Sequence, residues 1–190
     1  MNFTPKRKNG NMRALYLGLL GLGLILMVLN PENNSRRTAF VLVSLVSLTV
    51  GIYLMVRYEL TTYTYILNAK EDDFDFFVDK STGKRGNYVC YYKISDVASY
   101  LPYEKDTKDE LVKKYINISF YTYTNNPSCK TNVLVFGNRG HYDAIIMERD
   151  EAYDEYIRNA IRLAKEKQAE KSDDEEDIKD IDINENDTNE

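Results

Sequence analysis

Two long uncharged apolar segments near the N-terminus constrain the architecture more than any other feature of this sequence. Residues 14–29 contain eight leucines and no charged residue, and residues 38–56 form a second uncharged run of nineteen. About 20 apolar residues in a helix cross the roughly 30 Å hydrocarbon core of a bilayer. The sequence therefore predicts two transmembrane helices, over residues 14–30 and 38–56, joined in a hairpin that occupies residues 14–57.

Two other interpretations of these segments are possible. Basic residues precede the first segment, as they do in a cleaved signal peptide: Lys6, Arg7, Lys8 and Arg13. No small-residue cleavage site follows, however, and a turn at residues 30–35 leads directly into the second segment. A hairpin buried inside a soluble protein is disfavoured because helices that are apolar on every face need complete covering. The rest of the chain has its own apolar strands to bury.

The distribution of positive charge predicts the orientation of the hairpin. Lysine and arginine concentrate on the cytoplasmic side of membrane spans, and four of them lie within residues 1–13. The connection between the helices holds Arg36 and Arg37, opposed by Glu32. We therefore expect a multi-pass protein of the cell membrane with a basic cytoplasmic N-terminus over residues 1–13. Because two spans return the chain to the same side, everything after residue 57 is also expected in the cytoplasm.

Small residues in the hairpin identify candidate positions for helix packing. Ala14 and Gly18 have the small-xxx-small spacing, and so do Ser47 and Gly51. This spacing lets two helix backbones approach closely in a membrane. The partner is either the other helix of the hairpin or a helix of another protein. A transporter is disfavoured, since ion and substrate paths usually carry ionisable residues and these spans have only tyrosines of that kind.

Residues 58–168 change from continuous to alternating apolar residues, which is typical of strands. The expected strands are 60–67, 74–79, 88–94, 115–124, 132–136 and 142–147. Thr61, Tyr63, Tyr65 and Leu67 share one face of the first strand. Glycine-containing turns between strands favour antiparallel connections. Residues 95–103 follow neither period and are expected to be irregular, and residues 106–114 are expected to form a short helix.

The C-terminal part of the chain divides into a helix and a charged tail. Asp150 is a candidate cap for a helix with apolar residues at helical spacing: Tyr153, Tyr156, Ile157, Ala160 and Ala164. This helix is expected to pack on the sheet. Residues 170–190 then hold eleven acidic residues against two lysines. Such a composition cannot form a core, so we expect an acidic, disordered tail over residues 169–190.

The order of these elements resembles that of bacterial two-helix membrane proteins that carry a pleckstrin-homology-like domain. The resemblance covers residues 14–168 and includes the stretches 82–85 (TGKR) and 89–96 (VCYYKISD). It implies a membrane-anchored α+β protein in which an antiparallel β-barrel or sandwich is closed by a C-terminal helix. It further implies a binding or scaffolding module, since this fold displays peptide and lipid sites without a shared catalytic centre.

Basic and aromatic residues are the candidate binding residues of the domain. Phosphoinositide-binding members of the superfamily use basic residues between the first two strands, but residues 69–73 (AKEDD) are net acidic here. Lys80, Lys84 and Arg85 gather instead in the next hairpin, and Arg139 occupies another turn. Near an anionic leaflet each of these basic side chains contributes about 1 kcal/mol of attraction. In the alternative interpretation the two turns are simply exposed to solvent. The alternating residues from Tyr115 to Tyr123 predict an outward aromatic face.

Few residues of the chain suit catalysis or metal binding. The sequence has one histidine, His141, and two widely spaced cysteines, Cys90 and Cys129, which are expected to be free thiols. The nucleophile, phosphate-loop, dinucleotide and zinc-protease motifs are absent from the sequence. We therefore expect no enzyme activity, no cofactor and no metal. Nucleic acid is not expected as a partner, because no basic stripe is present and the tail is acidic.

These observations predict a membrane-tethered, non-catalytic interaction or scaffolding module at the cytoplasmic membrane face, with a protein partner. Two alternatives remain open from the sequence. One is a sensor of anionic lipid or of the membrane surface, acting through the basic turns. The other is an accessory subunit of a larger membrane complex, acting through the helical hairpin.

Overall fold

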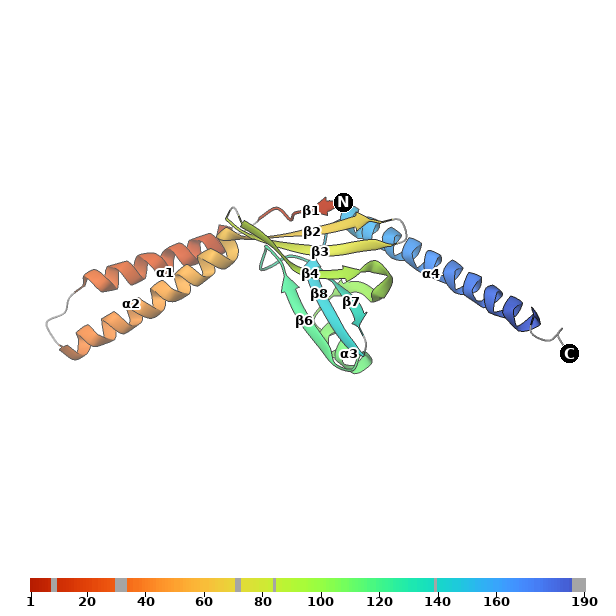
Figure 1. The fold of residues 1–190 in the computed structure, drawn as a ribbon. Coiled ribbons are helices and arrows are strands. Elements are labelled where there is room, and N and C mark those ends of the chain that lie inside the picture. Colours follow the sequence, from red (N-terminus) through yellow and green to blue (C-terminus); the bar gives the residue numbers. More distant parts are fainter. Residues whose placement is uncertain (8–9, 30–33, 71–72, 84, 139, 186–190) are drawn as a thin grey trace.

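The computed structural model describes residues 1–7, 10–29, 34–70, 73–83, 85–138 and 140–185, with side chains through residue 170 except at 34 and 35. It is an α+β fold with a helical hairpin at one end and a long C-terminal helix leaving at the other (Figure 1). Lys84 and Arg139, two of the predicted basic contact residues, lie outside the described residues.

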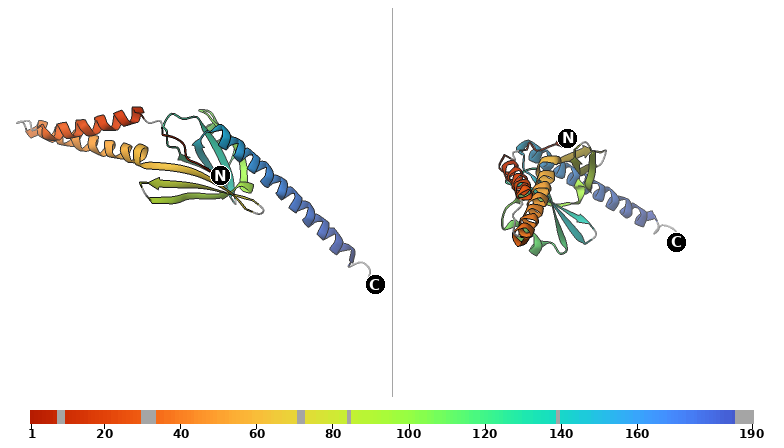
Figure 2. Two further views of the ribbon diagram at one scale, coloured as in Figure 1. Left: turned by 90° about the horizontal axis from the view of Figure 1, so that it is seen from above. Right: turned by 90° about the vertical axis from the view of Figure 1, so that its left-hand side faces the viewer.

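The hairpin consists of α1 (Gly10–Val28) and α2 (Asn34–Met55), which lie side by side (Figures 1 and 2). A short π-helix, η1 (Val56–Leu60), continues α2 toward the domain. Both helices are long and apolar enough to cross a membrane, and most of their surface is exposed. They lack the burial that the core helices of a soluble protein have.

Hydroxyl groups and glycines on α2 determine how closely the two helices approach. Ser44 Oγ donates to the carbonyl oxygen of Gly23 at 2.7 Å, and Ser47 Oγ donates to that of Leu19 at 2.8 Å. A Cβ atom on Gly51 would lie 2.9 Å from Cγ of Leu20. The absence of a side chain at Gly51 therefore permits this packing.

Two four-stranded sheets form the domain. The first has the order β1-β2-β3-β4, all antiparallel, and comprises β1 (Asn2–Phe3), β2 (Thr61–Ala69), β3 (Phe74–Thr82) and β4 (Arg85–Lys93). The second has the order β5-β7-β8-β6 and comprises β5 (Val97–Tyr103), β6 (Ile118–Tyr123), β7 (Thr131–Asn138) and β8 (His141–Glu148). β6 is parallel to β8, whereas the other pairs in this sheet are antiparallel.

The two sheets and two further helices bury two hydrophobic clusters. The larger cluster lies between the sheets and is closed by α4 (Glu151–Glu185), which contributes Tyr153 and Ile157. The smaller cluster lies on the other face of the second sheet, where α3 (Thr107–Lys114) contributes Leu111. Alternate residues of β7 enter different clusters, Leu134 the larger and Val133 the smaller. Burial on both faces explains the continuous apolar run in β7.

Most predicted elements of the domain are present. All six predicted strands occur, and the face of β2 predicted from Thr61, Tyr63, Tyr65 and Leu67 is buried. Helix α4 begins as expected, since the Asp150 carboxylate accepts a hydrogen bond from the N–H of Tyr153 at 3.0 Å. Of the predicted barrel or sandwich, the barrel is wrong, because neither sheet closes among the described residues. Strands β1, β4, β5 and β6 are the edges of two open sheets.

Residues 95–103 were expected to be irregular but contain the strand β5. A 3₁₀ turn, η2 (Ile94–Asp96), moves the chain from the first sheet to the second. A register shift between Val97 and Ser99 then disturbs the alternation of β5. The turn and the irregular register together hide the strand period in the sequence.

The prediction that Tyr115 begins an outward aromatic face is wrong for Tyr115 itself. Asn117 has a φ of 58°, which reverses the alternation before β6 begins. Tyr115 is therefore buried, while Ile116 is 79% exposed. Tyr121 does lie on the surface, at 41% exposure.

Helix α4 continues through much of the segment predicted to be disordered. Its helical span reaches Glu185, whereas the composition predicted disorder over residues 169–190. No glycine or proline interrupts residues 151–185, so the local sequence contains no strong helix breaker. Ala164 is the last core residue of α4 among the described side chains. In Figure 1 and in the left panel of Figure 2, α4 leaves the domain on the side away from the hairpin.

Candidate functional site

The residues that precede α1 belong to the domain. Phe3 pairs with Tyr65 of β2, and its ring lies 5.3 Å from that of Tyr153 on α4. The hydroxyls of Thr4 and Thr64 are 2.8 Å apart. The N-terminal segment, residues 1–7, thus forms an edge of the first sheet before the chain enters the hairpin.

A group of polar contacts, which we call the joint, connects the N-terminal segment, α1 and the segment from η1 to the start of β2. The Arg7 guanidinium donates to the main-chain oxygens of Glu59 and Thr61 and to the Thr62 hydroxyl. The Glu59 carboxylate accepts from the Tyr16 hydroxyl at 3.1 Å and from Arg13 at 3.2 Å. The joint therefore links all three segments at the domain end of the hairpin.

The loop that follows β6 holds the N-terminal segment from the other side. The Asn125 side chain accepts from the N–H of Tyr63 at 2.7 Å and donates to its carbonyl oxygen at 3.1 Å. The Asn125 side chain thus forms the two main-chain hydrogen bonds with Tyr63 that a neighbouring strand would otherwise form. Asn125 also donates to the oxygen of Pro5, and Asn126 donates to that of Lys6. The N-terminal segment is therefore bound along both edges.

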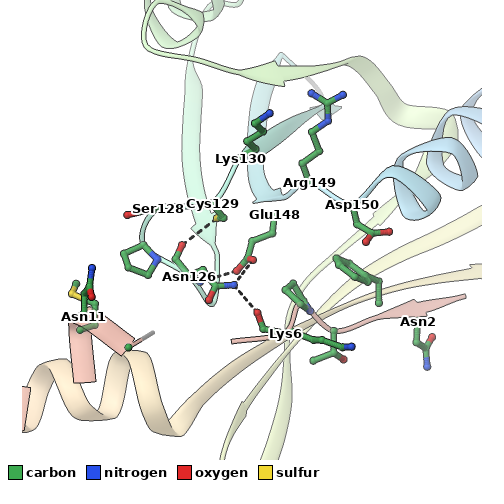
Figure 3. A pocket seen from close by; sticks show the side chains of 16 residues that line it. Asn2, Lys6, Asn11, Asn126, Ser128, Cys129, Lys130, Glu148, Arg149 and Asp150 are labelled. Carbon is green, nitrogen blue, oxygen red and sulfur yellow. Dashed lines mark hydrogen bonds between the residues drawn. The ribbon is translucent and has the colours of Figure 1, made fainter. Parts of the chain in front are cut away.

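A buried carboxylate organises this loop. Glu148, at the end of β8, is 5% exposed and accepts from the N–H groups of Asn125 and Asn126. Its second oxygen accepts from the Asn126 side-chain amide at 2.7 Å. A buried carboxylate requires such donors. Figure 3 shows Asn126 between Glu148 and the main chain at Lys6.

A cleft of about 1060 Å³ lies between the N-terminal segment, the start of α1, the loop after β6 and the end of β8 (Figure 3). This volume slightly exceeds the range usual for ligand sites, roughly 300–1000 Å³. Basic side chains of the lining come from three separate segments: Lys6, Lys130 and Arg149. Because Gly10 and Asn11 also line it, the cleft reaches the point where the hairpin begins.

The charged and reactive groups of the cleft are mostly engaged within the protein. Burial, together with the nearby Glu148 carboxylate, raises the pKa of Cys129 to about 11. The Cys129 thiol donates to the oxygen of Asn126 at 3.1 Å and is not a reactive thiolate near neutral pH. Arg149 pairs with Asp154 at 3.4 Å, and Asp150 caps α4. The arrangement suits polar recognition more than nucleophilic chemistry.

The structure places two predicted basic residues beside the hairpin. Thr61, the first residue of β2, pairs with Thr82, and Thr82 pairs with Arg85. The N–H of Gly83 donates to the oxygen of Leu60 at 3.3 Å. Arg85 and Lys80, both exposed, therefore lie at the end of the first sheet that is nearest to α2 (Figure 1). We call this end of β3 and β4 the β3–β4 tip.

The four predicted helix-packing residues divide into two pairs. Ser47 and Gly51 lie in the contact between α1 and α2. Ala14 and Gly18 are exposed, and a Cβ atom on Gly18 would meet nothing within 4 Å. The second pair is thus open to another helix, and its role in dimerisation remains a prediction.

No local sequence pattern marks the residues that assemble the joint and the cleft. Arg7 was interpreted as part of a basic segment, and nothing in the local pattern predicts its contact with Glu59, 52 residues away. Asn125 and Glu148 were not singled out either. The signal available for Glu148 was an acid that directly follows the apolar run at residues 144–147, which suggests a buried, hydrogen-bonded carboxylate.

Comparisons with known proteins add no relationship. No family model matches the chain, and no curated protein or solved structure is significantly similar to it. The interpretation of the site therefore depends on its geometry alone.

Proposed function

We propose that this protein is an integral membrane protein whose hairpin crosses the bilayer and holds the domain at the cytoplasmic face as a non-catalytic interaction module. The observation that carries this proposal is the joint. It links the segment that enters the hairpin, the segment that leaves it and the first sheet. A fixed orientation at a membrane is what a module needs to present one surface to a partner.

The exposure of the hairpin supports its insertion into a bilayer. Large apolar side chains cover the outside of both helices, for example Ile25 at 60%, Leu42 at 58% and Leu45 at 63% exposure. In water, each such side chain forgoes about 1.5–3 kcal/mol that burial would provide. A continuous apolar surface of this kind marks a membrane or protein contact. A lipid environment accommodates it along the full length of both helices.

The charges of the joint support a cytoplasmic orientation. Arg7, Arg13 and Arg57 all lie at the domain end of the hairpin, where Arg7 and Arg13 contact Glu59 and Arg57 donates to the oxygen of Thr124. Lysine and arginine that flank spans are retained preferentially in the cytoplasm. The domain is attached to this same end of the hairpin. An orientation with this end in the cytoplasm therefore places the arginines and the domain on the same side.

The cleft is the surface that we assign to the protein partner. Its walls include the N-terminal segment, which the joint connects to the hairpin, so the position of the cleft at the membrane is fixed. Lys6 and Lys130, together with Arg149 beside its partner Asp154, favour a partner segment with acidic or polar groups.

Site-specific photo-crosslinking in native membranes tests this function. A photoreactive amino acid replaces Ser128, an exposed residue of the cleft, or Lys113, an exposed residue of α3, as the matched control. We expect a discrete protein adduct from position 128 that Arg149→Glu reduces and that position 113 does not give. Identical adducts from both positions, or none from position 128, would argue against a partner in the cleft.

A further inference from the structure

We propose that the β3–β4 tip contacts the phosphate headgroups of anionic lipids through Lys80 and Arg85, in the leaflet from which α2 emerges. This inference relies on the proposed membrane insertion of the hairpin. It adds a second contact between domain and membrane, on a different side of the first sheet from the cleft.

The position of the tip follows from the register of the first sheet. Thr82 pairs with Thr61, the residue at which the chain leaves η1 and enters β2. Neighbouring strands lie about 4.8 Å apart, so β3 lies one strand spacing, and β4 with Arg85 two, from the chain that emerges from the bilayer. The hydrogen bond from Gly83 to Leu60 fixes this relationship.

The two ends of the first sheet differ in how far their charges are balanced. At the tip, Lys80 and Arg85 are exposed. Asp79, the nearest carboxylate in sequence, accepts a hydrogen bond from the Ser81 hydroxyl at 3.0 Å, and Glu59 is engaged in the joint.

The far end of the sheet carries both acids and lysines, including Lys93 opposite Asp75. Asp73 contacts Ser95, Asp75 pairs with Lys70, and Asp75 stands opposite Asn68 near the end of β2. With about 3.3 Å per residue, that end lies more than about 20 Å from Thr61. The sheet thus carries unbalanced positive charge at the end near the bilayer, whereas Lys70 and Lys93 accompany the acids at the far end.

An anionic lipid surface fits this arrangement better than a protein partner does. Both basic side chains are long, and such side chains extend their charged groups toward headgroups while their stems stay on the protein. The anionic surface potential decays within a Debye length, about 8 Å at physiological ionic strength. Because β2 begins directly after the helix that leaves the bilayer, the tip stays on the membrane side of the domain.

The absence of tryptophan from the chain permits a direct test. Single-tryptophan variants of the full-length protein are placed in nanodiscs, and quenching by lipids brominated near the headgroup or along the acyl chain is measured. Thr82→Trp reports on the tip, Leu45→Trp on the centre of α2, and Asn68→Trp on the far end of β2. Thr82 and Asn68 are both exposed, which limits the effect of the substitutions on folding.

We expect stronger quenching of the Thr82→Trp reporter by headgroup-level bromine in phosphatidylglycerol discs than in phosphatidylcholine discs. Each basic residue near an anionic surface should change the ratio of docked to undocked tip about fivefold. Lys80→Gln combined with Arg85→Gln should therefore lower this ratio about thirtyfold, and 0.5 M salt should weaken docking in a similar manner. The matched control, Lys93→Gln with Lys113→Gln, removes two exposed charges away from the tip and should have no effect.

The possible outcomes separate this inference from the proposed function. If the Leu45→Trp reporter is quenched by acyl-chain bromine but the tip responds to neither anionic lipid nor the double substitution, the inference is overturned and membrane insertion stands. A tip that binds a protein instead would also leave the Thr82→Trp reporter unquenched in pure lipid discs. If the Leu45→Trp reporter is not quenched, the hairpin does not span the bilayer and both proposals fail.

Discussion

The hydroxyl of Tyr16, on α1, donates a hydrogen bond to the carboxylate of Glu59, between α2 and β2, over 3.1 Å. Tyr16 is 3% exposed, although most of its helix is open to the surroundings. The contact therefore ties the first helix to the point at which the second helix becomes a strand. Several consequences of the fold depend on this link and on the packing around it.

Removing the Tyr16 hydroxyl should loosen the joint. Tyr16→Phe deletes one hydrogen bond to a charged acceptor, and we expect a loss of about 1.5 kcal/mol or more in the free energy of unfolding. Tyr53→Phe is the matched control, because Tyr53 is 66% exposed on α2. Thermal unfolding in detergent measures the stability. Spin-label distances between hairpin and domain should broaden only in Tyr16→Phe, and unchanged distances would show that the joint does not fix the orientation.

Leucine substitution should destabilise the hairpin at one of two glycines and not at the other. Gly51→Leu would place side-chain atoms against Leu20, where even a Cβ atom would lie 3.3 Å from the main-chain nitrogen. Gly18→Leu meets open space. We expect Gly51→Leu to separate the helices and lower the melting temperature, whereas Gly18→Leu leaves the monomer intact.

The oligomeric state of the Gly18→Leu variant tests the accessory-subunit alternative. If the exposed pair Ala14 and Gly18 binds another helix, as the small-xxx-small spacing predicts, Gly18→Leu should dissociate that complex without changing monomer stability. Analytical ultracentrifugation in detergent measures the complex. Equal effects of Gly18→Leu and Gly51→Leu on monomer stability would contradict the observed helix packing.

Glu148→Gln should release the N-terminal segment from the domain. The substitution places an amide nitrogen opposite the Asn126 side-chain amide, which now donates to the carboxylate at 2.7 Å. Leaving buried donors unsatisfied costs about 1–3 kcal/mol. Hydrogen exchange of residues 2–7 should accelerate in Glu148→Gln and remain unchanged in Glu155→Gln, which alters an exposed acid of α4. Unchanged protection in both variants would remove Glu148 from this role.

The domain should lose stability in alkaline solution because its buried thiols and phenols favour the protonated form. Burial raises the pKa of Cys90 to about 12 and that of Cys129 to about 11, from 9.0, and also raises the pKa of Tyr65 and Tyr153. A group whose pKa is higher in the folded state stabilises the fold fully below its unfolded pKa. That stabilisation is lost as the pH rises through the folded pKa.

The relevant range begins near pH 9, the unfolded pKa of the thiols, and extends to about 12. We expect the melting temperature to fall steadily across this range, and Cys129 to react with iodoacetamide more slowly at pH 8 than an unburied thiol does. A melting temperature that is constant to pH 11 would contradict the burial of these groups.

The local pattern of the sequence was sufficient for most strands and for α4. Thr61, Tyr63, Tyr65 and Leu67 alternate without interruption, and they form one buried face of β2. Tyr153, Ile157, Ala160 and Ala164 recur at helical spacing and form the core face of α4. Where apolar residues recur with the period of a strand or a helix over several residues, the pattern alone identifies the element and its buried face.

The remaining features depend on contacts between residues that are distant in sequence. The parallel pairing of β6 with β8 joins Ile118 to Tyr142, and no local signal distinguishes it from an antiparallel pair. Strand β1 has only two residues, too few for a period. The joint and the cleft likewise depend on Arg7 and Asn125 reaching segments more than 50 residues away. Such pairings form only when distant segments pack together in the folded chain, so the local sequence does not indicate them.

The central claim is that the hairpin spans the membrane and holds the domain on the cytoplasmic side. Native Cys129 is a poor reporter, because its thiol is half-buried and hydrogen-bonded. The most direct measurement uses Ser128→Cys with Cys90→Ser and Cys129→Ser, labelled by a membrane-impermeant thiol reagent in intact and permeabilised cells. The account predicts labelling only after permeabilisation, from a protein that stays in the membrane fraction after alkaline carbonate extraction. Labelling in intact cells, or release of the protein by carbonate, would contradict it.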